Sequence, residues 1–560
     1  MSVVLTEHLP LISAAPGGIQ KVRGLILELA VRGKLVPQIP TEEPVRDLLQ
    51  RIAQEQARLQ AAGIRKKRNP ALPVEEDEQL FPIPKNWRWA RLEQLVLGIN
   101  SGGTPSKSNP SFWKGNIPWA SVKDLGFGVP LTFTQDYITS SGLEAGSFLA
   151  KAGSILICTR MGLGKIGEAM IDVAINQDLK ALKLSEEIHK QYFINFFKTL
   201  SIKGSGVTVA GIKQDALLQF AVPIPPLSEQ HRIVAKVEEL MALCDRLEGE
   251  QADTESAQAK LVETFLSTLT QSTGAADFAA NWQRLAEHFD TLFTTESSVE
   301  LLKQSILELA VKGTLVSQES SDEPASELLR KNHKDCMIDF SPCNIEGSKN
   351  TASNSPVFSL PPGWAWVRSE TVANFIDPHP SHRTPPEFEG GVPYIGYAEI
   401  DHNSGIDFAA ARKVSPQVYK EHRDRYDLKI GDFVFGKIGT LGQPFFLPEP
   451  FDYCLSANLI LIQPNQLILN PKFLATFLDS PSFIREMSDK KTNSTHGVFG
   501  IKKARSICLP LPPLAEQHRI VARVDELMGI CDCLKEYFIE SRSRQAQLAS
   551  TLIDFALKAA

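Results

Sequence analysis

The stretch PIPPLSEQHRIVAKVEELMALCDRLE, residues 223–248, returns as PLPPLAEQHRIVARVDELMGICDCLK at residues 510–535. The two copies share 18 identical residues in 26 and lie 287 positions apart. A second repeat, ILELAVRGKLV from Ile26, recurs as ILELAVKGTLV from Ile306 at a spacing of 280. These spacings far exceed the ~20–50 residues of a solenoid repeat, so they indicate the tandem duplication of a whole module. Between the repeats the two halves hardly match, which predicts one scaffold that carries two different inserts.

The repeated stretch opens a long helix in each half. A pair of prolines precedes the first turn, where proline is tolerated. Side chains at alternating spacings of four and three then form the seam expected of a coiled coil, in a rod of roughly 65 Å. The first series is Ile233, Val237, Leu240, Cys244, Leu247, Gln251, Thr254, Gln258, Leu261 and Phe265, and the second is Ile520, Val524, Leu527, Cys531, Leu534, Phe538, Ser541, Gln545, Leu548 and Leu552. If the helices pair within one chain and each carries a domain at its start, they run antiparallel.

The repeats also predict where domains begin and end. Each long helix follows an insert, and a repeated short helix precedes each insert. The expected segments are 1–79 with a helix at 19–36 and a polar linker, a first insert at 80–222, a long helix at 223–275, a linker at 276–355 with the repeated helix at 299–316, a second insert at 356–509, and a long helix at 510–560.

Alternating tryptophans open each insert, Trp87 and Trp89 in the first and Trp364 and Trp366 in the second. Period-two spacing of aromatic residues predicts a strand. Such tryptophans can stack on nucleic-acid bases, but packing in a core is favoured about three to one. Short apolar runs separated by Gly, Pro, Ser and Asn follow, which is typical of a mixed α and β domain.

Composition and charge narrow the class of protein. The chain has 560 residues and a formal net charge of −6. Its composition, 43% hydrophobic and 22% charged residues, is typical of ordinary globular domains. Its eight cysteines form no CxxC pair and no Cys/His cluster at zinc spacing, which favours reduced thiols. The sequence shows neither a signal peptide nor a membrane-spanning run, so we expect a cytoplasmic protein.

The two inserts differ in charge. Residues 80–222 contain 15 Lys and Arg against 10 Asp and Glu, whereas residues 356–510 contain 16 of each. A cluster of like charges is more often a solvated face than a ligand site. The cations of the second insert nevertheless stand in pairs, such as Arg412 with Lys413 and Arg423 with Arg425.

Several motifs in a fixed order resemble the specificity subunits of type I restriction–modification systems. The resemblance covers essentially the whole chain. It is carried by the duplicated PPLSEQHRIVAKVEELM and PPLAEQHRIVARVDELM, by LELAVRGKLVPQ near the N-terminus, and by SGGTPSKSNPSFWKGNIPW at residues 101–119. NQDLKAL at Asn176 and GVTVAGIK at Gly206 also match, and STHGVFGIK at Ser494 answers the latter. The second insert has only DPHPSHRTPPEFEGG (377–391) where the first has SGGTPSKSNPSFWKG, so contacts cannot be transferred between these loops.

The resemblance implies an α+β fold with two target-recognition domains, here called readers, separated by two long antiparallel coiled-coil helices in a pseudo-two-fold arrangement. Each reader is expected to read one half of a bipartite asymmetric site in double-stranded DNA. The helices are expected to dock the adenine-methylating modification subunits, two of them, and restriction subunits would join these. S-adenosylmethionine, ATP and magnesium are expected on those partners, with no cofactor, metal or membrane contact in this chain.

Phosphate contacts require exposed cations, because DNA binding is driven largely by counterion release. Arg or Lys would read guanine, and Asn or Gln adenine. The candidates in the first reader are Thr104, Lys107, Lys114, Lys123, Arg160 and Lys165, and those in the second are Arg383, Arg412, Lys413, Arg423, Arg425, Lys437, Lys490 and Lys491. The target sequence cannot be deduced from these residues.

The sequence contains no recognisable catalytic motif. The [N/D]PP[Y/F] loop of adenine methyltransferases is absent, and GLGK (162–165) lacks the first glycine and the Ser or Thr of a phosphate-binding loop. We interpret GLGK as a glycine-rich turn after a strand at 155–158. His231 and His518 form a matched pair at the starts of the long helices. We expect them to have a structural role or to contact another subunit rather than to act in catalysis. Two alternatives remain: a scaffold whose twin domains bind proteins, and an enzyme whose motif is not recognised.

Overall fold

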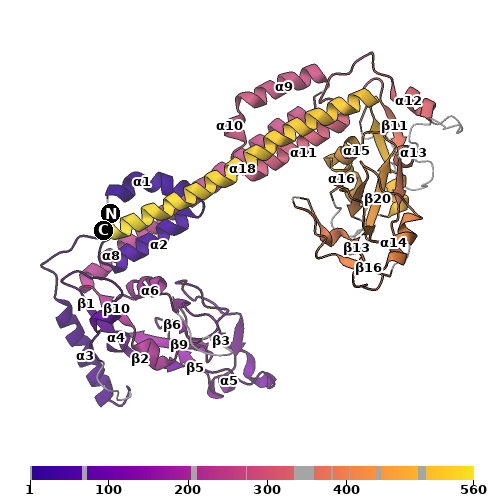
Figure 1. The fold of residues 1–560 in the computed structure, drawn as a ribbon. Coiled ribbons are helices and arrows are strands. Elements are labelled where there is room, and N and C mark those ends of the chain that lie inside the picture. The colour runs from indigo at the N-terminus through magenta and orange to yellow at the C-terminus, as the bar shows by residue number, and fades with distance from the viewer. Residues whose placement is uncertain are drawn as a thin grey trace. The chain divides into compact units, whose positions relative to one another are not determined.

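The computed structural model describes residues 3–65, 72–202, 211–272, 274–332, 358–379, 383–402, 404–436, 443–489 and 500–559. The chain divides into two compact units. The first comprises Met1–Asp253 with Ser541–Ala560, and the second comprises Thr254–Glu540. Two long helices, α8 (Leu227–Thr270) and α18 (Leu514–Ala559), contribute residues to both units (Figure 1).

In the first unit the repeated short helix binds both long helices. Helix α2 (Gly18–Val31) follows α1 (Val3–Ala14) and precedes α3 (Val45–Ala61). Arg23 of α2 pairs with Asp245 of α8 at 2.6 Å, and Lys21 Nζ donates to Ser550 Oγ of α18 at 2.6 Å. Helix α2 ends before position 36, where the sequence placed its end, because Gly33 adopts a left-handed φ of 69°. The predicted pair of long helices is thus a bundle that includes α2.

The second unit repeats this arrangement with α11 (Glu296–Lys312), which follows α9 (Ala275–Glu287) and α10 (Phe289–Leu292). Lys303 of α11 pairs with Asp532 of α18, and Lys312 Nζ donates to the Thr270 carbonyl of α8 at 3.3 Å. The start of α8 lies in the first unit with the end of α18, and the end of α8 lies in the second unit with the start of α18. The two helices therefore run in opposite directions.

Burial follows the predicted seam in the first half of each helix, whereas in the second half it follows the seam only at some positions. Eight predicted seam residues contribute to the cores: Ile233, Val237, Leu240, Cys244, Ile520, Val524, Leu527 and Cys531 are buried. Leu247 and Leu534 are partly buried, as are Phe265 and Leu552. Leu261 and Leu548, in contrast, are 50% and 47% exposed, and Val262 and Ala549 are buried instead.

Each long helix packs in a different core in each unit: Ile233 and Ala549 lie in one core, and Ile520 and Val262 lie in the other. The buried pairs Ile233 and Val262, and Ile520 and Ala549, are each 29 residues apart, whereas heptad spacing selects 28. The heptad spacing therefore does not continue across the polar middle of the helices.

The first reader contains two four-stranded sheets, in the orders β2-β9-β6-β7 and β4-β3-β8-β5, and the antiparallel pair β1-β10. Helices α4 (Leu92–Leu95), α5 (Ser140–Glu144), α6 (Lys190–Thr199) and α7 (Gln214–Leu218) complete it. The strands are β1 (Arg88–Arg91), β2 (Val96–Ser101), β3 (Trp113–Ala120), β4 (Asp136–Ile138), β5 (Phe148–Ala150), β6 (Ile155–Cys158), β7 (Ile166–Glu168), β8 (Val173–Ile175), β9 (Leu179–Leu184) and β10 (Ala221–Ile224).

The second reader has a closely similar topology although its sequence differs. Its sheets run β12-β20-β17-β18 and β16-β13-β19, with the pair β11-β21; among the described residues it has no counterpart of β5, and it adds the two-stranded sheet β14-β15. The strands are β11 (Ala365–Arg368), β12 (Ala373–Ile376), β13 (Val392–Ile395), β14 (Ile400–Asp401), β15 (Gly405–Ile406), β16 (Arg412–Val414), β17 (Phe433–Gly436), β18 (Phe445–Phe446), β19 (Cys454–Leu455), β20 (Leu459–Pro464) and β21 (Cys508–Leu511). The helices are α12 (Ala325–Asn332), α13 (Ser369–Val372), α14 (Pro416–Arg423), α15 (Pro471–Leu478), α16 (Pro481–Asp489) and α17 (Ile501–Arg505). The duplication therefore includes the readers as well as the frame.

Each reader is built on the tryptophan that opens it. Trp87 is 1% exposed and meets Tyr192 edge-to-face at 6.3 Å, while Trp364 meets Phe473 in the same way at 6.2 Å. Core packing, rather than base stacking, is confirmed for these two side chains. Cys158, Cys244, Cys454, Cys531 and Cys533 are free thiols, but Cys508 is disulfide-bonded, contrary to the expectation from the sequence.

Candidate nucleic-acid interface

A hollow of about 600 Å³ lies beside β3 and β4 in the first reader. Lys107 and Lys114 line it together with Trp113, Gln135 and Tyr137. Trp113 fixes the preceding loop, because its indole Nε1 donates to the Ser106 carbonyl at 3.1 Å and its ring meets Trp119 edge-to-face at 5.1 Å. Lys114 has a left-handed φ of 60°, which is uncommon for a residue other than glycine. Two of the predicted cations thus share one concave surface.

The remaining candidates of this reader lie elsewhere or are engaged internally. Thr104 Oγ1 donates to Gln177 Oε1 at 2.5 Å on the exposed surface. Arg160 lies 3.6 Å from Asp178, and Lys165 Nζ donates to the Val122 carbonyl at 2.8 Å. Lys123 is exposed. Lys165 therefore stabilises the turn between β6 and β7, which confirms the structural interpretation of GLGK.

In the second reader the candidates gather around strand β16. Arg412 and Lys413 are exposed on this strand, which is an edge of its sheet, and Arg412 Nη1 donates to the Pro385 carbonyl at 3.3 Å. Arg423 pairs with Asp427 at 3.0 Å and lies over the Tyr419 ring at 5.8 Å. Lys437, Lys490 and Lys491 lie outside the described residues, as do most of GVTVAGIK and STHGVFGIK.

A buried polar chain holds the loop that carries Arg383 in the second reader. His379 Nδ1 lies 2.9 Å from His422 Nε2, and His422 Nδ1 lies 2.9 Å from the Tyr426 hydroxyl. The other ring nitrogen of His379, Nε2, lies 3.3 Å from the Arg383 carbonyl. Arg425 Nε donates to the Asp377 carbonyl of the same loop at 3.1 Å. Burial and the nearby His379 lower the pKa of His422 to about 4. Sequence patterns did not reveal this chain of hydrogen bonds, because His379 and His422 lie 43 positions apart in the polypeptide.

The two readers share one cation-bearing element and differ in another. The loop before β3 carries Thr104 and Lys107, and the equivalent loop before β13 carries Arg383. Lys114, however, lies on β3, whereas Arg412 and Lys413 lie on β16, the topological equivalent of β4. Gln135 and Tyr137, which the sequence reasoning missed, extend this surface in the first reader with the donor and aromatic groups that base recognition uses.

The repeated EQHRIV motif attaches each long helix to its reader. Gln230 is fully buried; its Oε1 accepts from the His189 backbone N–H at 2.8 Å and its Nε2 donates to the Pro225 carbonyl at 3.1 Å. Gln517 makes the same bonds, to the Asn470 N–H at 2.7 Å and the Pro512 carbonyl at 3.0 Å.

The neighbouring glutamate and histidine of the motif also serve the structure. Glu229 accepts from Gln38 Nε2 at 2.6 Å, and Glu516 accepts from Gln318 Nε2 at 2.9 Å and Trp364 Nε1 at 3.0 Å. Burial raises the pKa of both carboxyl groups. His231 meets His189 edge-to-face at 4.6 Å, and His518 Nδ1 lies 3.0 Å from Asn470 Nδ2, so both histidines contact their readers.

Comparisons with known proteins agree with this architecture. Residues 84–254 and 364–536 match the family described as "Type I restriction modification DNA specificity domain". The chain is 33% identical to the type I restriction enzyme EcoAI specificity subunit of Escherichia coli, over 96% of this chain and 94% of that protein. It is 30% identical to the EcoEI specificity subunit of the same organism, with the same two coverages. The chain belongs to the family of type I restriction–modification specificity subunits.

The chain is also similar to solved structures, at lower sequence identity than to these two specificity subunits. A chain from a study of complex assembly and conformational transition of the type I R-M system is 19% identical, with a TM-score of 0.49 over 85% of this chain and 99% of that one. The HsdS subunit from Thermoanaerobacter tengcongensis is 18% identical, with a TM-score of 0.40 over 85% and 98%. Among the described residues, no helix is long and apolar enough to cross a membrane, and no three His, Cys, Asp or Glu side chains gather as a metal site.

Proposed function

We propose that this chain is the DNA sequence-specificity subunit of a type I restriction–modification complex and that each reader reads one half of a bipartite, asymmetric site. The observation that carries the proposal is the duplicated reader, in which two closely similar folds built from different sequences each present exposed cations on strands and on the loop before the equivalent strands β3 and β13. A shared topology places the two surfaces on a common scaffold, while different side chains select different bases.

The chain would direct chemistry that its partners perform. The long helices would dock two modification subunits, which bind S-adenosylmethionine and methylate adenine, and restriction subunits would supply ATP-driven cleavage in the cytoplasm. The flipped adenine would enter the pocket of a modification subunit. The chain itself would be non-catalytic. Methyl transfer by the isolated chain with labelled S-adenosylmethionine would favour an enzyme instead, and binding without sequence preference would favour a protein scaffold.

Exchange of one reader tests the proposal. Residues 80–222 are replaced by the equivalent segment of a related subunit with a different target, and the methylated adenines of host DNA are mapped. We expect one half of the methylated motif to change and the other half to stay, because the readers are separate domains that share only a frame. The matched control exchanges residues 356–509 and should change only the other half. Simultaneous change of both halves in either exchange would contradict independent reading.

A further inference from the structure

Each reader has an exposed edge strand at the same place in its fold. Strand β4 is the outer strand of the sheet β4-β3-β8-β5, and β16 is the outer strand of the sheet β16-β13-β19. Each edge strand pairs antiparallel with one neighbour, β4 with β3 and β16 with β13 (Figure 1). An edge strand is accessible from its unpaired side, and a pair of strands fits into the major groove of DNA.

The pairing registers align the two edge strands residue by residue. Both neighbouring strands contain a proline followed by an aromatic residue, which aligns β3 with β13. Trp119 of β3 pairs with Asp136, whereas the equivalent Tyr394 of β13 pairs with Arg412. Position 136 therefore corresponds to position 412. The prolines that precede these aromatic residues pair with Tyr137 and Lys413, which correspond in the same way.

A close backbone contact supports this alignment. A Cβ atom at Gly115 would lie 2.3 Å from the Ile138 carbonyl oxygen, and a Cβ atom at Gly391 would lie 2.1 Å from the Val414 carbonyl oxygen. Ile138 and Val414 are the next aligned pair, and both are fully buried. In each reader a glycine thus allows the chain to pass close to the buried end of the edge strand.

The aligned positions carry different chemistry in the two readers. Asp136 and Tyr137 are exposed in the first reader, and Arg412 and Lys413 are exposed in the second. Among the described residues, the side chains of Asp136 and Lys413 have no hydrogen-bond or ion-pair partner, and Arg412 donates to the Pro385 carbonyl from Nη1 alone. A carboxylate accepts from the amino group of cytosine, whereas Arg and Lys donate to guanine O6 and N7. The same strand position therefore suits a different base in each reader.

Lysines lie beside the carboxylate of the first edge strand. Lys107 and Lys114 line the hollow of about 600 Å³ that also contains Asp136 and Tyr137. Lys114 lies where the pairing register of β3 with β4 shifts, and such a bulge changes the direction of a side chain. These lysines can bind phosphates, so they allow the carboxylate to approach a negatively charged duplex.

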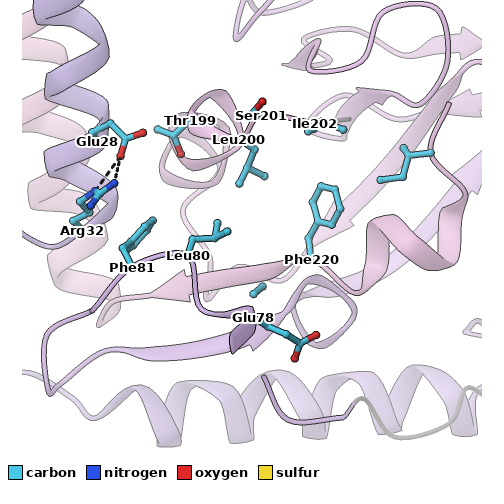
Figure 2. A pocket seen from close by; sticks show the side chains of 12 residues that line it. Glu28, Arg32, Glu78, Leu80, Phe81, Thr199, Leu200, Ser201, Ile202 and Phe220 are labelled. Carbon is cyan, nitrogen blue, oxygen red and sulfur yellow. Dashed lines mark hydrogen bonds and ion pairs between the residues drawn. The ribbon is translucent and has the colours of Figure 1, made fainter. Parts of the chain in front are cut away.

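Another hollow of the first unit, of about 450 Å³, has different chemistry. Its wall is mainly apolar and includes Leu80, Leu200 and Phe220. Arg32 is the one cation among the described residues that line it, and Arg32 Nη2 lies 2.9 Å from Glu28 Oε2 (Figure 2). Because this cation is already paired, the hollow beside β4 is the one of the two that suits DNA.

We propose that the edge strands β4 and β16 read base pairs in the major groove, an inference that rests on the function proposed above. Asp136 accepts from the amino group of a cytosine in one half-site, and Arg412 donates to a guanine in the other. Lys107 and Lys114 bind phosphates that flank the first of these bases. The two halves of the site differ because one strand position carries a carboxylate in the first reader and a guanidinium in the second.

The proposal is tested with the chain in complex with its modification subunits. Methylated adenines are mapped first for the wild type, and then for Asp136→Arg and Arg412→Ala. We expect Asp136→Arg to replace a cytosine by a guanine at one position of one half-site. We expect Arg412→Ala to accept any base in place of one guanine of the other half-site, because the bidentate contact is lost.

Binding to duplexes with single base-pair substitutions separates base reading from phosphate contact. The Arg412→Ala complex should lose about tenfold or more of its discrimination at the affected base pair. Lys107→Ala and Lys114→Ala should weaken binding to all duplexes alike and reduce its salt dependence. Lys151→Ala is the matched control, because it removes an exposed cation beside β5, at the opposite edge of the same sheet, and should change neither motif nor affinity.

Two results would overturn the proposal. One is a wild-type motif and unchanged base discrimination in the Asp136→Arg and Arg412→Ala complexes. The other is equal weakening of these complexes on every duplex, which would make both residues phosphate contacts. Melting temperatures equal to that of the wild type, expected because the replaced side chains are exposed, exclude unfolding as the cause. A wild-type complex that methylates no bipartite motif would refute the proposed function itself.

Discussion

At the scale of single residues, the repeated glutamine of the EQHRIV motif is the main attachment of reader to helix. Replacing Gln230 by Ala leaves the buried His189 N–H and Pro225 carbonyl without their side-chain partner. We expect a loss of about 2 kcal/mol or more in the stability of the first unit, typical of unsatisfied buried backbone groups. Thermal unfolding of the full chain measures this. Ser228→Ala is the matched control, since Ser228 is exposed and the second copy already has Ala515; an equal effect of both changes would disprove the role.

His422 makes the second unit sensitive to acid. Its pKa is lowered from the ordinary 6.5 to about 4, so between these values the unfolded chain binds a proton that the folded chain does not. Stability therefore falls as pH falls from about 6.5 to about 4, by up to about 3 kcal/mol at the low end. His422→Gln should flatten this part of the pH–stability curve, whereas His402→Gln, at an exposed position of the same reader, should not. An unchanged curve in the His422 variant would contradict the argument.

At the scale of elements, the buried face of each long helix moves by one residue between the two units. Val262 is 1% exposed and Leu261 is 50% exposed, although heptad spacing selects Leu261. We expect Val262→Ser to lower the melting temperature of the second unit by about 4 °C and Leu261→Ser to lower it by less than about 1 °C. Calorimetry of the two variants decides between the registers. A larger loss of melting temperature in the Leu261→Ser variant than in the Val262→Ser variant would support a continuous heptad seam instead.

At the scale of the whole molecule, the two long helices connect the units that carry the readers, because each helix contributes residues to both units. If their length sets the unread spacer, a matched heptad inserted after Asp253 and after Glu540, at the junction of the two units, should lengthen it. One heptad adds about 10.5 Å, close to three base pairs at 3.4 Å each. We expect the same two half-sites with about two or three more base pairs between them, measured by mapping methylated adenines. An active variant that methylates the original motif, with its original spacer, would show that helix length does not set the spacer.

The sequence by itself determined the duplication, the long helices, the mixed α and β inserts and the family. These depend on short-range patterns: the prolines before a helix, apolar residues at spacings of four and three, and tryptophans at period two. The buried role of Trp87 and the turn at GLGK followed from the same local patterns, and the structure confirms both.

The tertiary structure alone decided which residues meet. Val262 rather than Leu261 enters the core because α8 packs in a different core in each unit, which no local pattern reveals. Lys107 shares a hollow with Lys114 and Tyr137 only once β3 and β4 have paired. His379 and His422, 43 residues apart, become hydrogen-bonded neighbours through the packing of the second reader. Long-range pairing fixes these contacts, whereas sequence periodicity records only which face of an element is buried.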